Sequence, residues 1–229
     1  MSARWTLAVL AASALSLSVL AAVLGAADLA ADNARSTLSG WRDSGRMGNG
    51  QGWASLAARL QLARRIEPRD AGHRAAIAEL LSWWLIAALP ETRSRTEVLR
   101  AARAEQLAAL ARRPTWAMAW ARLADLDYLA GRGARDVFPA LERAAALGPF
   151  EPGVQFVIGR VGLGLWDGLD PAQRGLVEEA VRRSLASGSN RRPFALLALH
   201  HGRVEWLAGL SSDPAYRAEL TRMQTDARR

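Results

Sequence analysis

Residues 116–149 read WAMAWARLADLDYLAGRGARDVFPALERAAALGP, and they are the most informative segment for the fold class. Its apolar residues recur at helical spacing on both sides of a Gly-Arg-Gly turn, which predicts two helices joined as a hairpin. Strand-favouring runs of Val, Ile, Thr and Tyr are nearly absent from the chain, whereas alanine, the best intrinsic helix former, is abundant. The sequence therefore predicts an all-α protein.

The same stretch resembles one degenerate tetratricopeptide repeat. Seven of its residues match or adjoin signature positions of that repeat: Trp120, Leu123, Ala124, Tyr128, Ala140, Ala144 and Pro149. The tyrosine falls one place beyond its usual position. One hairpin cannot bury its own apolar face, so the resemblance implies a short stack of antiparallel hairpins with a concave surface for peptides or partner helices.

Prolines and capping residues mark the ends of further helices. Apolar helical runs stop at Pro68, Pro114 and Pro149, at intervals typical of stacked hairpins. Two pairs predict helix starts as capping boxes, in which a Ser or Asp side chain and a Glu or Gln three residues later each bind the other's backbone N–H: Ser94–Glu97 and Asp170–Gln173. A third start is predicted at Asp213–Pro214, where an N-cap aspartate precedes a first-turn proline.

The N-terminal region favours a membrane anchor. Residues 5–27 carry no charge and lie between Arg4 and Asp28; about 20 apolar residues are needed to cross a bilayer as a helix. A cleaved signal peptide is the main alternative, with a cleavage site at residues 25–27, and a soluble core helix is the third. The run is longer than the apolar core of a usual signal peptide, so we expect a retained transmembrane helix.

The predicted organisation has three parts. Residues 1–28 form the anchor or signal peptide, residues 29–52 a Gly-rich linker, and residues 53–229 the helical-repeat domain. The linker is assigned because five glycines fall within residues 39–52, a density that disfavours a helix. We expect the soluble domain in the periplasm of a bacterium, although Arg35, Arg42 and Arg46 would by charge count alone place that flank in the cytoplasm.

Composition narrows the classes of partner. The net charge is +8, but arginine supplies all of the basic side chains and alternates with acidic residues, which argues against a nucleic-acid partner. The absence of cysteine excludes disulfides and thiolate metal sites.

No residue pattern predicts catalysis, so we expect no enzyme, no cofactor and no metal. His200 and His201 diverge on a helix and His73 stands apart; each is interpreted as structural or on the surface. Asp125 and Asp127 lie about 200° apart on a helix and do not converge. The glycines of VIGRVGLGLWDG, residues 157–168, lie in helical sequence and favour close helix packing over a dinucleotide site. Most tryptophans are expected in the core.

A narrower resemblance suggests a pathway. The segments RRPTWAMAWARLADL, LERAAALGPFEP and GLWDGLDPAQRGLVEEAVRRSL, within residues 112–185, resemble the VpsP-type proteins of bacterial exopolysaccharide loci. The resemblance implies a role in the production or export of surface polysaccharide. Together with the anchor and the helical repeats, it leads us to expect a membrane-tethered adaptor in exopolysaccharide biosynthesis or export. We expect its partners to be other proteins of that assembly system and its N-terminal helix to lie in the inner membrane; homo-oligomers are left open. The alternatives are a general periplasmic protein of envelope assembly and a polysaccharide-active enzyme.

Overall fold

The computed structural model describes residues 2–44, 50–87, 94–186, 188 and 190–227. Within them the chain forms eleven α-helices and one short 3₁₀ helix and contains no strand, so the all-α prediction is confirmed. The chain divides into two compact units, Met1–Arg112 and Arg113–Arg229. The predicted single domain over residues 53–229 therefore contains a boundary at residue 112.

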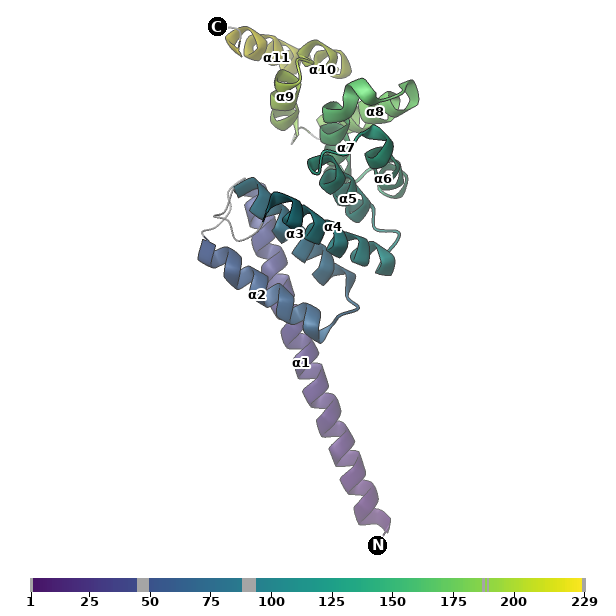
Figure 1. The fold of residues 1–229 in the computed structure, drawn as a ribbon. Helices are drawn as coiled ribbons and strands as arrows, with labels where there is room; N and C mark the ends of the chain where they lie inside the picture. Colours follow the sequence, from purple (N-terminus) through teal and green to yellow (C-terminus); the bar gives the residue numbers. More distant parts are fainter. Residues whose placement is uncertain (1, 45–49, 88–93, 187, 189, 228–229) are drawn as a thin grey trace. The chain divides into compact units, whose positions relative to one another are not determined.

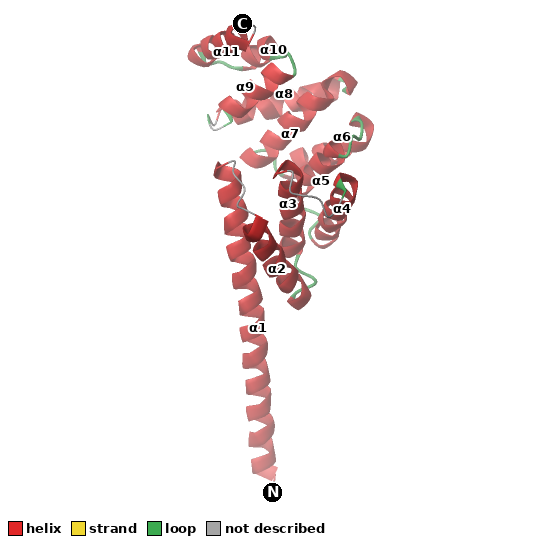
Figure 2. Cartoon of the chain, turned by 60° about the vertical axis from the view of Figure 1, so that its left-hand side comes forward, coloured by secondary structure: helices red, strands yellow, loops and turns green. Residues whose placement is uncertain are grey.

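Unit 1 consists of four helices. These are α1 (Ser2–Ser44), α2 (Gly50–Ile66), α3 (Ala71–Ala87) and α4 (Arg95–Arg112). Helix α3 packs along α4 and α1 along α2, and α3 also contacts both α1 and α2. Helices α2 and α3 lie against the C-terminal part of α1, and the N-terminal part of α1 projects beyond them (Figure 1, Figure 2).

Helix α1 has two halves of different character. In the C-terminal half one face is buried at alternating spacings of four and three residues, which is the period of a packed helical seam: Ala27, Ala31, Ala34, Leu38 and Trp41. In the N-terminal half large apolar side chains are exposed: Leu15, Leu17, Val19, Leu20 and Val23. This helix is long and apolar enough to cross a membrane.

The linker prediction for residues 29–52 is wrong over most of its length. Helix α1 continues to Ser44 and α2 begins at Gly50, while residues 45–49 lie outside the described residues. Tertiary packing overrides the poor helix propensity of the glycines here. Ala31 packs with Ala27 and Ala63 of α2, and the Trp41 ring meets Trp83 of α3 edge to face with centroids 6.1 Å apart.

Unit 2 contains two helical hairpins and a C-terminal group of three helices. Its elements are α5 (Ala117–Leu129), α6 (Ala134–Leu147), α7 (Pro152–Leu165), η1 (Trp166–Gly168), α8 (Pro171–Ala186), α9 (Arg191–His200), α10 (Val204–Leu210) and α11 (Pro214–Ala227). Helix α5 pairs with α6 and α7 with α8, and α7 joins the hairpins by contacting both α5 and α6. The largest fully buried side chains of this unit include Phe138 and Phe194.

Three helices are each followed by the same type of turn. Residues 67–70, 113–116 and 148–151 each carry proline in second place, as predicted from Pro68, Pro114 and Pro149. In each, the fourth residue's N–H donates to the first residue's carbonyl over 3.2–3.3 Å. Proline presets the backbone angle needed at that position of a β-turn. These Pro turns separate successive helix pairs and give the chain its repeat.

The three predicted helix starts are confirmed by their hydrogen bonds. Ser94 and Glu97 exchange side-chain-to-backbone hydrogen bonds of 3.0 and 3.2 Å, and Asp170 and Gln173 do the same at 3.1 and 2.9 Å. Asp213 accepts from the backbone N–H groups at the start of α11. These backbone hydrogen bonds, and then Arg191, hold the pKa of Asp213 below its ordinary value.

The glycines of α7 permit close helix packing, as the sequence predicted. A Cβ on Gly159 would lie 2.6 Å from Phe194, and one on Gly162 would lie 2.3 Å from a Val177 methyl of α8. Contacts this short cannot be tolerated. Glycine at these positions therefore lets α7 approach α8 and α9 closely.

Candidate binding groove

Helices α2, α3 and α4 enclose a groove of about 470 Å³ on unit 1. Its volume lies within the range of about 300–1,000 Å³ that is usual for ligand pockets. Most of its lining is apolar, and the residues come from one face of each helix: Trp53, Ala57, Gln61, Ile77, Leu80, Leu81, Trp84, Val98, Ala101, Ala104 and Glu105.

The floor and the walls of the groove differ in burial. Ile77, Leu80 and Val98 are buried and form an apolar floor, while the rings of Trp53 and Trp84 are half-buried. The Trp53 indole N–H points to the Leu80 carbonyl at 3.4 Å. Two half-exposed indole rings over an aliphatic floor favour an apolar or aromatic side chain as ligand.

Two polar residues that line the groove, Gln61 and Glu105, are already paired. Glu105 accepts from Arg64 through one carboxylate oxygen and from Arg74 through the other, each at 3.0 Å. The Gln61 side-chain oxygen accepts from Arg64 at 3.1 Å. The glutamate links α4 to both α2 and α3, so this network fixes the spacing of the helices that form the groove.

The groove was not identified from the sequence, although its pattern is visible there. Trp53, Ala57 and Gln61 recur every four residues on α2, and Ile77, Leu81 and Trp84 follow the same face of α3. Helical periodicity marks such a face as apolar. It does not tell whether a neighbouring helix or a ligand covers that face. Trp84 was expected in the core, and no place was predicted for Trp53.

The predicted repeat residues lie on the α5–α6 hairpin and the turn after it. Leu123, Ala124, Ala140 and Ala144 are buried between helices. Pro149 is half-buried, and its carbonyl accepts from Arg183 over 2.9 Å.

The two remaining signature residues are aromatic and half-buried. Trp120 donates to the Pro114 carbonyl at 2.8 Å. The Tyr128 ring occupies the space that a Cβ on Gly164 of α7 would need. All seven residues thus serve packing within unit 2, and none lines the groove of unit 1.

The acidic pair of α5 diverges as predicted. Asp125 pairs with Arg160 of α7, and burial lowers the pKa of that guanidinium from its ordinary value. Asp127 is buried and lies 3.4 Å from Arg132 Nε. Each carboxylate thus has its own arginine, and the pair does not form an acid–base couple.

Fewer tryptophans are buried than the sequence predicted, and the three histidines differ in burial. Among the tryptophans with described side chains only Trp41 and Trp166 are buried, and the others are half-exposed. A ring of this size is seldom fully enclosed. His200 is exposed and His201 is half-buried, whereas His73 is fully buried in unit 1.

No protein-family model matches the chain, and no curated protein is similar to it. The fold and the groove therefore define the class: an all-α protein of paired helices, with one N-terminal helix long and apolar enough to cross a membrane.

Proposed function

We propose that the protein is a membrane-tethered helical-repeat adaptor whose groove binds an apolar segment of a partner protein. One observation carries the proposal. Helix α1 is continuous from its exposed apolar half to the half whose buried face packs into unit 1, the unit that forms the groove. A tether of this kind raises the local concentration of a bound partner at the membrane.

The chemistry of the groove favours a peptide over a sugar. Sugar hydroxyls need several polar groups that are available for hydrogen bonds, whereas Glu105 uses both carboxylate oxygens on Arg64 and Arg74 and the Trp53 N–H points to a backbone carbonyl. The apolar floor suits the side chains of an amphipathic helix or an extended apolar segment.

The pathway part of the proposal is supported by the resemblance of residues 112–185 to VpsP-type proteins. On that basis the adaptor acts in bacterial exopolysaccharide biosynthesis or export, with its helical units in the periplasm and its partners among the proteins of that system. Its contribution is positional, since it holds a partner at the inner membrane.

A genetic complementation experiment tests both parts. Deletion of the gene should reduce surface polysaccharide, and the wild-type gene should restore it. Ala104→Trp, which fills the groove from an exposed position on α4, should fail to restore it. Ala111→Trp is the matched control, because Ala111 is exposed on the same helix but does not line the groove.

Three other results would overturn part of the proposal, provided that the wild-type protein and its variants are expressed at equal levels. Normal polysaccharide in the deletion strain overturns the pathway and leaves a general role in envelope assembly as the second candidate. Full restoration by Ala104→Trp overturns the groove as binding site. Turnover of a glycan by the purified protein overturns the adaptor in favour of an enzyme.

A further inference from the structure

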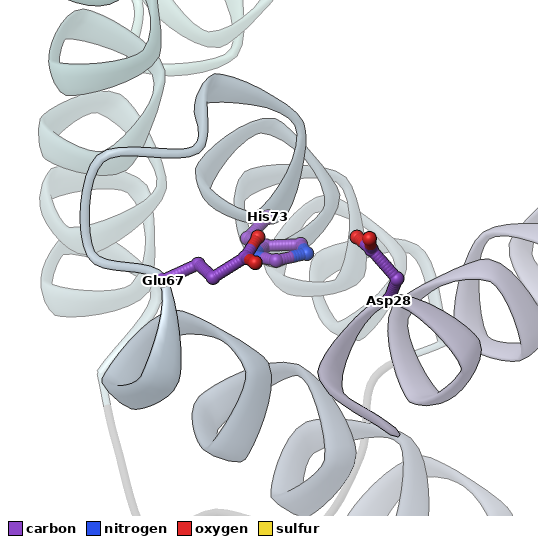
Figure 3. A group of neighbouring side chains, drawn as sticks. All are labelled: Asp28, Glu67 and His73. Atoms are coloured by element: carbon purple, nitrogen blue, oxygen red, sulfur yellow. The ribbon is translucent and has the colours of Figure 1, made fainter. Parts of the chain in front are cut away.

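Three side chains from separate elements of unit 1 converge beside α1. Asp28 belongs to α1, Glu67 is the first residue of the Pro turn after α2, and His73 lies in the first turn of α3. One potential ligand atom from each lies within 4.8 Å of the other two. Figure 3 shows the carboxylates of Asp28 and Glu67 directed toward the His73 ring.

The buried His73 ring has no hydrogen bond to the described residues. The His73 side chain is 0% exposed, and neither Nδ1 nor Nε2 has a hydrogen-bond partner among the residues that the structure describes. The nearest charged partner in the described part of the chain is Asp70, whose Oδ1 lies 3.7 Å from Nδ1 and instead accepts the His73 backbone N–H at 2.7 Å. Buried polar atoms are nearly always paired, so an imidazole with two unpaired nitrogens calls for an explanation.

A bound cation supplies that explanation. Three atoms within 4.8 Å of one another share a position no farther than about 2.8 Å from each, and Zn–N and Zn–O bonds are about 2.0–2.2 Å long. Side-chain movements of less than about 1 Å bring all three atoms to bonding distance.

We propose that Asp28, Glu67 and His73 bind one divalent transition-metal ion of the Zn²⁺ type. The donor set of one imidazole nitrogen and two carboxylate oxygens selects against Mg²⁺ and Ca²⁺, which prefer oxygen ligands alone. Three protein ligands leave the fourth tetrahedral position to water. Figure 3 shows the three side chains reaching the site from different elements.

The ion would fasten α1 to the rest of unit 1. Asp28 is the first charged residue after the uncharged run of residues 5–27, and it lies one residue after the start of the buried face of α1. The ion therefore joins the end of the apolar half of α1 to the α2–α3 turn, and its binding should stabilise that connection.

Metal titration of the purified full-length protein in detergent tests the site. After treatment with EDTA and removal of the chelator, isothermal titration with ZnCl₂ should show one ion per chain, and Zn²⁺ should raise the melting temperature. X-ray absorption at the zinc edge should show imidazole and oxygen ligands at about 2.0–2.2 Å. MgCl₂ at the same concentration should have no effect on melting.

Four variants locate the ligands. Asp28→Asn and Glu67→Gln should each weaken Zn²⁺ binding by more than about tenfold, and His73→Leu should abolish it. The control His200→Gln/His201→Gln should bind as wild type does. Asp28 and Glu67 are at least partly exposed, so their variants decide the matter even where His73→Leu fails to fold. The proposal is overturned by a wild-type chain that binds no stoichiometric Zn²⁺, or by undiminished binding in Asp28→Asn and Glu67→Gln.

Discussion

The indole N–H of Trp120 donates to the carbonyl of Pro114 over 2.8 Å. The acceptor belongs to the Pro turn at residues 113–116, and the donor lies on the first turn of α5. The tryptophan therefore fixes the turn that enters the first hairpin of unit 2. This hydrogen bond explains why Trp120 is only half-buried: its indole N–H holds the turn, and its ring is not enclosed in the core.

Trp120→Phe should destabilise unit 2 by about 0.5–1.5 kcal/mol, because it removes this hydrogen bond and keeps most of the ring packing. Trp120→Ala should cost more, since the remaining packing is lost as well. Urea unfolding followed by circular dichroism measures both values. An unchanged midpoint for Trp120→Phe would show that the hydrogen bond does not hold the turn.

Ala144→Arg should destabilise unit 2 by more than about 3 kcal/mol, since it forces a long charged side chain into a fully buried position of α6. Ala146→Arg is the matched control on the same helix, at an exposed position, and should leave stability within about 0.5 kcal/mol. Thermal melting compares the two. Equal melting temperatures would contradict the packing of the α5–α6 hairpin.

Gly162→Ala should lower stability by about 1–3 kcal/mol, because its Cβ would lie 2.3 Å from Val177. Gly175→Ala on α8 is the comparison: its Cβ would meet no described atom within 4 Å, so it should raise stability by about 0.4–1 kcal/mol. The opposite signs, measured by urea unfolding, distinguish a packing role for the α7 glycines from general helix propensity. A stabilising Gly162→Ala would refute that role.

Tyr216→Phe should change how stability depends on pH. Burial, followed by the charge of Glu219, raises the pKa of Tyr216 from 10.0 to about 12. The unfolded chain therefore releases this proton first, and wild-type stability should fall as the pH rises from about 10 to about 12. The variant loses the hydrogen bond to the Arg191 carbonyl, so it should be less stable at neutral pH and lack that alkaline decline.

Melting temperatures of both proteins between pH 7 and pH 12 provide the measurement. Parallel curves would show that Tyr216 does not titrate differently in the folded protein. Loss of helix in the variant at neutral pH would be detected by circular dichroism and is not expected, since phenylalanine retains the buried ring.

The local signals of this sequence were sufficient to predict where several of its helices begin or end. The Pro turns and the capping residues at Ser94, Asp170 and Asp213 act through short-range hydrogen bonds, so they can be read from neighbouring residues alone. The packing glycines of α7 were recognised because helical sequence continues on both sides of them.

Three features that depend on contacts between residues distant in the sequence were not predicted: the packed face of α1, the cluster around His73 and the groove. The seam from Ala27 to Trp41 is alanine-rich and precedes a glycine cluster, so it was interpreted as anchor and linker although its spacing alternates between four and three. Asp28, Glu67 and His73 share no sequence motif, and only the packing of α1 on α2 and α3 brings them together. The groove was missed for the same reason, because three separate helices form it.

Alkaline carbonate extraction of membranes that contain the full-length protein tests directly whether α1 crosses the bilayer. A helix that crosses the bilayer through residues 5–27 should keep the wild-type chain in the membrane pellet. Leu17→Arg/Leu20→Arg places two charges in the exposed apolar half, at about 2.5–3.5 kcal/mol each, and should move the protein to the supernatant. Leu29→Arg, an exposed leucine beyond that run, should stay in the pellet. Release of the wild-type chain by carbonate, or a shortened soluble form beginning near Asp28, would contradict the membrane tether.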